Sequence, residues 1–467
     1  MDNIFVAIRD CNEESQTSTL VHILEGYLSR NQATLDEEKL RWLLQRNFTM
    51  STLDISARFH SDDLWVVSAI PYLKRNSQSI LHLRVHGHWR QKIYIDDDII
   101  RSVSKQHQDV LVTLKLTGVH RVTTEGVKIL ASGFPRLSTI DFSGCQLIDD
   151  NALMSMSRHY FNLNKISVCG CQEITNIGLL SLMSTQITFV DVGDTSVTDD
   201  GILQFVRGCP NLSDLGSYSV SDELIFDLCS SISHHHPLSA LMGDGNKAEL
   251  TDYGLSILST PLDGDDRLHS SMGRPHLSKI RIYSCLGITN FGLEKLGGRF
   301  IDRDTHYLGC RHLTHVTLSD CQSVTDIGIL HLCQGCREIR ILDLIFCDDI
   351  SDDALASVCK YCRDLTAINL FGCGGIGSGD YNIFNDLARL PYLQYANLVG
   401  TYVFYYGVVS LLTALSNETH VRWTEEVLEL ILEAGRFPYE NDRIAIGNAA
   451  PPFVTIKYHP FPRIYHA

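Results

Sequence analysis

A spacing of apolar residues recurs along most of this chain, and it constrains the fold more than any other feature of the sequence. Each copy has apolar residues at positions 0, 3 and 5 and a small residue at position 8, as in Leu137, Ile140, Phe142 and Cys145. Where the chain is regular, successive copies start 24 to 26 residues apart. The thirteen starts are Met50, Ile80, Leu111, Leu137, Leu163, Ile187, Leu212, Leu238, Leu277, Leu313, Ile339, Leu365 and Leu393.

Each copy can be interpreted as one strand followed by one helix. Position 0 to position 5 forms a short strand whose apolar side chains point inward. A Thr or Ser followed by Asp or Asn, as at residues 174–176, 324–326 and 350–352, then caps a helix. Glycines recur at one phase of that helix, where the next copy is expected to pack too closely for a side chain: Gly178, Gly201, Gly254, Gly292 and Gly328.

No single unit of this kind can bury its own apolar face, whereas stacked units share one continuous core. A period of this length, with a strand and a helix in each unit, is typical of a leucine-rich repeat solenoid. The sequence therefore predicts an α/β leucine-rich repeat solenoid, a curved horseshoe with parallel strands on the concave face and helices outside.

The repeat also resembles a known class. The form L-x-x-L-x-L-x-x-C-x-x-I-T-D-x-G-L, seen most clearly in VTTEGVKILASGFPRLSTIDFSGCQLIDDNAL at residues 122–153, resembles the cysteine-containing leucine-rich repeats. It is similar to the repeats of F-box/leucine-rich-repeat proteins and of the antagonist-of-mitotic-exit-network family. The resemblance implies a role shared by many members of the class, which are substrate receptors of cullin-based ubiquitin ligases.

The repeats divide the chain into three parts. Residues 1–47 are expected to be a helical N-terminal cap or a degenerate adaptor-binding segment, and residues 48–415 a solenoid of about 13 repeats. Residues 416–467 are expected to form a C-terminal capping helix and tail. Two longer steps place extra loops near residues 259–276 and 298–311, on the same edge of neighbouring repeats.

The cysteines admit two interpretations. The pairs Cys333–Cys336 and Cys359–Cys362 have the spacing of a zinc site. However, the two pairs are separated by the length of one repeat. The position that Cys336 and Cys362 occupy in their repeats is occupied in other repeats by Phe, Tyr or Leu, which cannot replace a cysteine as a metal ligand. A buried packing role therefore accounts better for the cysteines, and neither a metal nor a cofactor is expected.

Charge and motifs limit the classes of function. The chain has 39 Lys plus Arg and 55 Asp plus Glu, a net charge of −16, which disfavours nucleic-acid binding. The sequence contains no run of 18 apolar residues, so no membrane span is expected. No secretory leader is apparent at the N-terminus, which favours the cytoplasm, the nucleus or both. The sequence has no nucleophile elbow and no phosphate-binding loop, so no enzyme is expected.

Strand alternation predicts where a partner binds. Side chains at positions 2, 4 and 6 face the concave side. In the last repeats these positions become apolar, so Ile345, Phe371 and Val399 are expected to form one exposed column, with Ile341, Ala367 and Tyr395 beside it. The alternative is that the C-terminal tail covers this patch. The predicted partner-binding residues are Lys279, Arg281, Tyr283, Ile341, Ile345, Phe371, Tyr395 and Val399.

Residues 1–47 bear on the kind of partner. Their apolar residues follow helical spacing, which suits either a cap on the solenoid or a helix pair that presents apolar side chains to an adaptor of the Skp1 or elongin C type. The segment lacks the Leu-Pro opening of an F-box, and it resembles the elongin-binding box except that Leu24 replaces the cysteine of that box. The candidate adaptor-binding residues are Leu20, Ile23, Leu24, Tyr27 and Leu28.

Together these features predict a non-catalytic protein-interaction protein. The leading hypothesis is a substrate-recognition subunit of a cullin-RING, SCF-like ubiquitin ligase that binds a protein substrate on the concave face. The alternative is a leucine-rich repeat scaffold or regulator without an adaptor-binding function.

Overall fold

The computed structural model describes most of the chain. The described residues are 37–45, 52–55, 69–75, 80–86, 95–104, 110–160, 162–184, 186–217, 220–231, 238–244, 250–259, 277–284, 286–300, 307–379, 383–403, 405–417, 428–433, 440–451 and 454–459. They fall into two compact units, residues 1–212 and residues 213–467. None of the described helices is long and apolar enough to cross a membrane.

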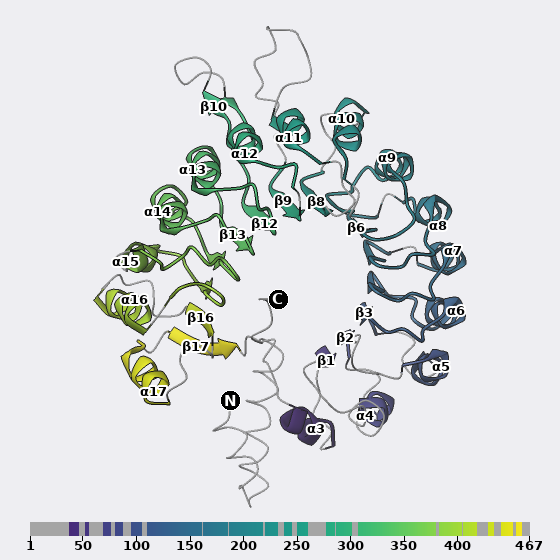
Figure 1. Cartoon of the computed structure of the whole chain (residues 1–467). Coiled ribbons are helices and arrows are strands. Elements are labelled where there is room, and N and C mark those ends of the chain that lie inside the picture. Colours follow the sequence, from purple (N-terminus) through teal and green to yellow (C-terminus); the bar gives the residue numbers. More distant parts are fainter. Residues whose placement is uncertain are drawn as a thin grey trace, which may run out of the picture. The chain divides into compact units, whose positions relative to one another are not determined.

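Unit 1 alternates helices and strands from α3 onward, and its strands pair in the order β1-β2-β3-β4-β5-β6 (Figure 1). All of these pairings are parallel. The elements are α3 (Glu37–Gln45), β1 (Thr52–Ile55), α4 (Ile70–Arg75), β2 (His82–His86), α5 (Asp97–Ser104), β3 (Thr113–Thr117), α6 (Thr124–Gly133), β4 (Thr139–Asp141), α7 (Asp150–Ser157), β5 (Lys165–Ser167), α8 (Asn176–Ser181), β6 (Phe189–Asp191) and α9 (Asp199–Gly208).

Unit 2 continues the same alternation, with parallel strands in the order β7-β8-β9-β12-β13-β14-β15-β16-β17. The elements before β12 are β7 (Asp214–Gly216), α10 (Asp222–Ser231), β8 (Ala240–Asp244), α11 (Asp252–Ser259), β9 (Lys279–Tyr283), α12 (Asn290–Gly297), β10 (Arg299–Phe300) and β11 (Tyr307–Leu308). The remaining elements are β12 (His315–Ser319), α13 (Asp326–Gly335), β13 (Ile341–Ile345), α14 (Asp352–Tyr361), β14 (Ala367–Asn369), α15 (Ile383–Ala388), β15 (Tyr395–Asn397), α16 (Tyr405–Asn417), β16 (Leu428–Glu433), α17 (Glu440–Ala449) and β17 (Val454–His459).

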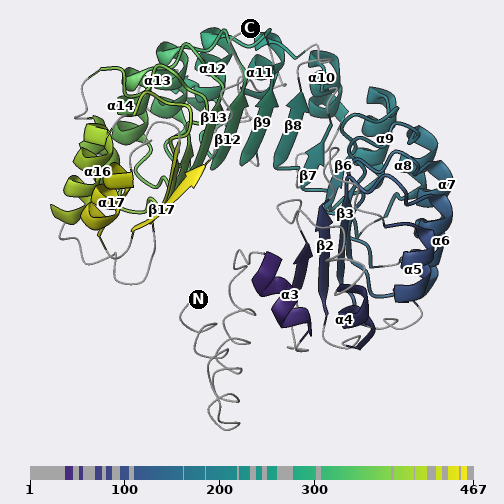
Figure 2. The ribbon, with the colours of Figure 1, turned by 60° about the horizontal axis from the view of Figure 1, so that its bottom comes forward.

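The core of each unit lies between its strands and its helices, which form a second layer along one face of the strands (Figure 2). Leu137, Ile140, Phe142 and Cys145 are all buried, and strand pairing aligns position 3 of one repeat with position 3 of the next. The predicted α/β leucine-rich repeat solenoid of parallel strands and outer helices is therefore confirmed. We call the face of the strands that is turned away from the helices the open face; it is the face that the sequence predicted to be concave.

The helix starts follow the predicted capping pattern and add a bond between repeats. Thr289 caps α12, because its hydroxyl accepts from the backbone N–H of Phe291. Asp252 of the preceding repeat accepts from the backbone N–H of Thr289 at 2.8 Å and from its hydroxyl at 2.7 Å. The same carboxylate lies 2.3 Å from the place where a side chain on Gly292 would begin. The predicted crowding at the helix glycines is therefore confirmed, but its source is an Asp or Asn side chain of the preceding repeat and not the next repeat.

The C-terminal region differs from the expectation of a capping helix and tail. Residues 428–433 and 454–459 form β16 and β17, which extend the parallel sheet beyond residue 415. Leu428, Leu430 and Leu432 are buried, so this region belongs to the core of unit 2. The described residues of the tail thus lengthen the sheet. Residues 460–467, whose placement bears on whether the tail covers the patch, lie outside the described residues.

The insertion predicted near residues 298–311 contains a small antiparallel pair. Residues Arg299 and Phe300 of β10 pair with Leu308 and Tyr307 of β11. The insertion predicted near residues 259–276 lies, apart from Ser259, outside the described residues.

Candidate protein-binding surface

The predicted partner-binding residues come together on the open face of unit 2, because they occupy aligned positions of neighbouring strands. At position 2, β9, β12, β13, β14 and β15 align Lys279, His315, Ile341, Ala367 and Tyr395. At position 6, Tyr283 of β9 aligns with Ser319 of β12 and Ile345 of β13. Seven of the eight predicted residues are partly exposed.

Val399 is the exception, and its predicted exposure is wrong. Its relative exposure is 0%. The sequence interpretation treated β15 as the last strand, whereas β16 pairs with β15 on its far side, and Leu398 donates from its N–H to the carbonyl of Ile431. Val399 therefore follows a strand that has a neighbour on both sides, and not the last strand of the sheet. The binding role of the other seven residues stays a prediction.

Cationic side chains form one part of this surface. Lys279 Nζ lies 3.3 Å from Asp214 Oδ1, and Arg281 Nη1 lies 3.0 Å from Met242 Sδ. Burial lowers the pKa of the His315 imidazole below its usual value, and three nearby cations lower it further. These cations are Lys279, Arg281 and Arg340.

Asp343 lies beside the cations, in the centre of β13. Burial raises the pKa of its carboxyl above the usual value, although the Thr317 hydroxyl and the charge of Arg281 act in the opposite direction. The Thr317 hydroxyl donates to Asp343 Oδ2 at 3.0 Å. The surface thus keeps a partly buried carboxylate at a cost in stability.

An apolar cluster forms the other part of the surface. We define it as Ile341 and Ile345 of β13, together with Phe346 and Phe371, which lie in the turns that follow β13 and β14. The Phe346 and Phe371 rings meet edge to face, with centroids 5.0 Å apart and planes at 86°. Phe346 has a relative exposure of 39%. Aromatic side chains that are held in place yet exposed are common at the centres of protein interfaces.

Phe346 was not among the residues predicted from the sequence. It occupies position 7, which the spacing of positions 0, 3, 5 and 8 ignores. Position 7 holds Gly, Asp or Ser in the other repeats that the structure describes at this position, so alignment of the repeats would have singled out this phenylalanine.

The candidate adaptor-binding residues Leu20, Ile23, Leu24, Tyr27 and Leu28 lie outside the described residues. The last part of the N-terminal region is described as the helix α3, which begins with Glu37 and Glu38, acidic residues that suit a helix start. Leu40, Leu43 and Leu44 of α3 are buried. This helix therefore contributes to the core of unit 1 and does not offer these leucines to a partner.

The cysteines that the structure describes form no disulfide bonds, and most are buried. At position 8 the thiols of Cys145, Cys171, Cys347 and Cys373 donate to carbonyls of the preceding repeat, for example Cys145 Sγ to Leu116 O at 2.9 Å and Cys373 Sγ to Leu344 O at 2.7 Å. Burial raises the pKa of Cys373 to about 12. Within the described residues, no group of three or more His, Cys, Asp or Glu side chains is placed to hold a metal ion. These contacts are those expected of packing residues.

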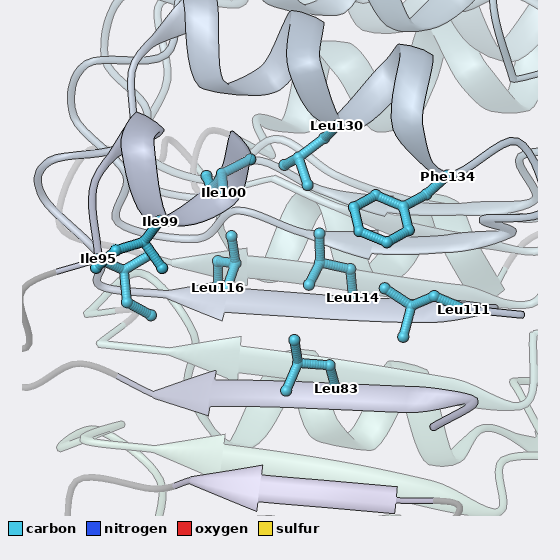
Figure 3. Close-up of a pocket in the computed structure, with 9 residues that line it drawn as sticks. All are labelled: Leu83, Ile95, Ile99, Ile100, Leu111, Leu114, Leu116, Leu130 and Phe134. Atoms are coloured by element: carbon cyan, nitrogen blue, oxygen red, sulfur yellow. The ribbon is translucent and has the colours of Figure 1, made fainter. Parts of the chain in front are cut away.

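A cavity of about 30 Å³ lies in unit 1 between α5 and α6 and the strands β2 and β3 (Figure 3). Only apolar side chains line it: Leu83, Ile95, Ile99, Ile100, Leu111, Leu114, Leu116, Leu130 and Phe134. A cavity this small, with no polar group to orient a ligand, is a gap in packing and not a binding site.

Comparisons with known proteins agree with this fold. A family model described as Leucine Rich repeat matches residues 309–333. No curated protein is significantly similar in sequence. A chain in the crystal structure of the Rad7 and Elc1 complex from yeast has a TM-score of 0.53 and 16% identity, and the match covers 76% of this chain and 83% of that chain.

A chain of the Toll–Spatzle complex of Drosophila has a TM-score of 0.33 and 13% identity, with 78% of this chain and 41% of that chain covered, and this similarity is too low to support an argument. The repeat match at residues 309–333 and the yeast structure both agree with the strand and helix order described above. The chain is a leucine-rich repeat protein.

Proposed function

We propose that the chain is a non-catalytic interaction protein that serves as a substrate-recognition subunit of a cullin-RING, SCF-like ubiquitin ligase. The observation that carries the interaction role is the open face of unit 2, where the apolar cluster lies beside Lys279, Arg281 and His315. Mixed surfaces of this kind, with aromatic and Arg side chains, suit protein partners. Such a role is expected in the cytoplasm, the nucleus or both.

Two observations support the ligase part of the proposal. The repeat form resembles that of F-box/leucine-rich-repeat proteins, and the yeast structure of similar fold is a complex of Rad7 with Elc1. Residues 1–47 contain the apolar stripe Leu20, Ile23, Leu24, Tyr27 and Leu28, which has the helical spacing that an adaptor groove would bind.

The test is capture of purified Skp1, elongin C and cullins by the full-length chain. We expect one adaptor to bind, and we expect Leu24→Asp and Leu28→Asp to abolish its binding because a carboxylate cannot enter an apolar groove. Ser15→Asp adds the same charge to the same segment and serves as the control. Absence of capture by the full-length chain would exclude the ligase role.

The alternative is a leucine-rich repeat scaffold or regulator without an adaptor. The burial of Leu40, Leu43 and Leu44 favours it, because at least this part of the N-terminal region stabilises the first repeats. In that case Leu24→Asp lowers the stability of unit 1 in urea while no adaptor is captured.

A further inference from the structure

In every repeat whose position 7 lies among the described residues, that residue has a left-handed backbone. The residue is glycine in several repeats, with φ between 68° and 79° at Gly118, Gly144, Gly170, Gly372 and Gly400. Three other repeats have a short polar residue there, namely Asp194, Ser284 and Asp320, with φ between 49° and 53°. These residue types tolerate the left-handed region best.

Phe346 occupies the same position with φ 52°. A bulky side chain is strained in this region of backbone space, so the fold alone would be better served by glycine. Strain of this kind is retained where a side chain has another use. The 39% exposure of Phe346 shows that the ring is not needed to fill the core.

The neighbouring repeat holds the ring in a fixed position. The N–H of Phe346 donates to the carbonyl of Phe371 at 2.8 Å, and the Phe371 ring packs against its edge. A side chain on Gly372 would begin 2.3 Å from Cδ1 of Phe346, so the absence of a side chain there makes room for the ring. Because the ring is already ordered, a partner that packs on it loses little conformational entropy.

The charge next to the ring indicates what such a partner carries. The chain has a net charge of −16, yet this face places three cations, Lys279, Arg281 and Arg340, near His315. Burial lowers the pKa of the His315 imidazole, and these three charges lower it further. Arg281 lies on β9, two strands from β13, which is roughly 10 Å at the usual strand spacing. An extended peptide covers that distance with about three residues, so side chains two to four residues apart reach both groups.

We propose that Phe346 anchors a binding site, on the open face of unit 2, for a protein segment that carries a large apolar side chain two to four residues from an acidic one. The apolar side chain packs on the rings of Phe346 and Phe371, and the carboxylate contacts the cations around Arg281. This inference rests on the proposed role as an interaction protein and names the chemistry of the segment that is bound.

The experiment has two measurements on the full-length chain. The first is selection of binders from a displayed library of random 12-residue peptides, in which we expect enrichment of peptides with a large apolar residue two to four positions from Asp or Glu. A synthetic peptide of the most enriched sequence then serves as the probe. We expect Phe346→Gly to weaken its binding by about tenfold or more, and Arg281→Glu to do the same.

The second measurement is unfolding in urea. Phe346→Gly is expected to raise the midpoint for unit 2, because glycine relieves the strained backbone. A merely structural phenylalanine would instead lower the midpoint when it is removed. A gain of stability together with a loss of binding is therefore the result that only an anchoring role produces.

Two controls match the substitution. Asp320→Gly makes the same backbone change one repeat earlier, and Phe291→Ala removes an exposed ring from α12 on the helix layer. Both are expected to keep the affinity for the peptide. The proposal is overturned if the library yields no such peptides, if Phe346→Gly binds the probe as the wild type does, or if its midpoint falls.

Truncation after His459 tests whether the chain's own last residues occupy the site. We expect unchanged affinity for the probe, and a tenfold gain would assign the site to the tail and overturn the proposal. No adaptor is used in these measurements. A failure of the ligase proposal at Leu24 and Leu28 therefore leaves this result unaffected, and the reverse also holds.

Discussion

At the scale of the residue, the bond that joins one repeat to the next is made by the Asp or Asn that follows each helix cap. Asp150 accepts from the N–H and the hydroxyl of Thr175, and Asp326 does the same with Ser351. Hydrogen bonds to a charged acceptor contribute about 1.5–3 kcal/mol each. The Asp or Asn that belongs to the helix-start motif of one repeat thus also bonds to the next repeat.

Asn176 and Gly201 allow this contact to be measured. The Asn176 side chain bonds the N–H and hydroxyl of Thr198, and a side chain on Gly201 would begin 2.1 Å from Asn176 Oδ1. We expect Gly201→Ala to destabilise unit 1 by about 1–3 kcal/mol through this overlap. In the Asn176→Ala background the same substitution should cost less, because the overlapping atoms are gone.

Urea unfolding of the four variants in this cycle gives the coupling energy. Full additivity of Gly201→Ala and Asn176→Ala would show that the glycine is required for some other reason. Ser132→Ala, on an exposed position of α6, provides a control that removes a side-chain atom without touching a neighbouring repeat.

Asp343 gives a prediction about pH. The raised pKa of its carboxyl means that the folded state binds a proton more readily than the unfolded state. Its contribution to stability is therefore present at low pH and is lost as the pH rises through the raised pKa of the folded protein. Asp343→Asn mimics the protonated form, so the variant should be more stable than the wild type at neutral pH.

The difference should shrink as the pH falls through that pKa, and urea midpoints across this range measure it. A variant that is less stable than the wild type at neutral pH would show that the ionised carboxylate, with its neighbours Thr317 and Arg281, is favourable overall. Asp141→Asn on the open face of unit 1 is the matched control, since it makes the same change on a strand of the other unit.

Single residues also mark the limit of what the sequence predicts. The crowding at the helix glycines could be predicted because glycine recurs at one position of the repeat. The burial of the cysteines could be predicted because apolar residues replace them at the same positions of other repeats. The strained Phe346 was missed because its neighbours in the sequence, Ile345 and Cys347, fit the repeat. The burial of Val399 was missed because it depends on a strand that lies about 30 residues further along the chain.

At the scale of the element, the spacing of apolar residues locates the strands well. Every one of the thirteen predicted starts is followed two residues later by a parallel strand, from β1 at Thr52 to β15 at Tyr395. The reason is physical, because positions 0, 3 and 5 are the side chains that the stacked core must bury.

The two strands that were missed have the same spacing of apolar residues in the sequence, at Val427, Leu430 and Leu432 and at Phe453, Ile456 and Tyr458. Leu430 and Leu432 of β16 are buried, whereas Ile456 and Tyr458 of β17 are partly exposed. Both strands were overlooked because the step from Leu393 to Val427 is 34 residues and position 8 holds Gly435 and Phe461 instead of cysteine. These irregular repeats retain the apolar residues at positions 0, 3 and 5 but lack the regular step and the cysteine at position 8 by which the other repeats are recognised.

Leu430 tests whether β16 is part of the solenoid. It is fully buried at position 3, so Leu430→Ala should destabilise unit 2 by about 2–4 kcal/mol, as expected for a truncated core side chain. Thr455→Ala, at an exposed position of the neighbouring strand β17, should change the stability by less than about 0.5 kcal/mol. Equal effects of the two substitutions in urea would mean that this region behaves as a loose tail.

At the scale of the whole molecule, contacts between neighbouring repeats determine how far the effect of a destabilising substitution extends along the chain. The repeat bonds and thiol contacts described above each join a residue to the adjacent repeat, and the chain divides into two compact units at residue 212. In a solenoid of this kind, stability is approximately a sum of repeat terms and interfaces between neighbours. A local defect is therefore expected to open its own unit before the other.

The rates at which buried thiols react with a reagent measure which unit opens first. Burial raises the pKa of Cys171 in unit 1 and of Cys347 and Cys373 in unit 2 to about 12, so all three should react slowly with a thiol reagent while they are folded. Leu344→Ala removes a buried side chain of β13. The backbone carbonyl of Leu344 accepts a hydrogen bond from the Cys373 thiol. We expect this substitution to accelerate labelling of Cys347 and Cys373 at low urea while Cys171 keeps its wild-type rate.

Mass spectrometry of the labelled peptides gives the three rates. The matched substitution in unit 1 is Ile140→Ala, which truncates a fully buried side chain of β4. We expect Ile140→Ala to accelerate labelling of Cys171, while Cys347 and Cys373 keep their wild-type rates. Equal acceleration of all three thiols by either substitution would show that the two units unfold as one, because a defect confined to its own unit leaves the thiols of the other protected.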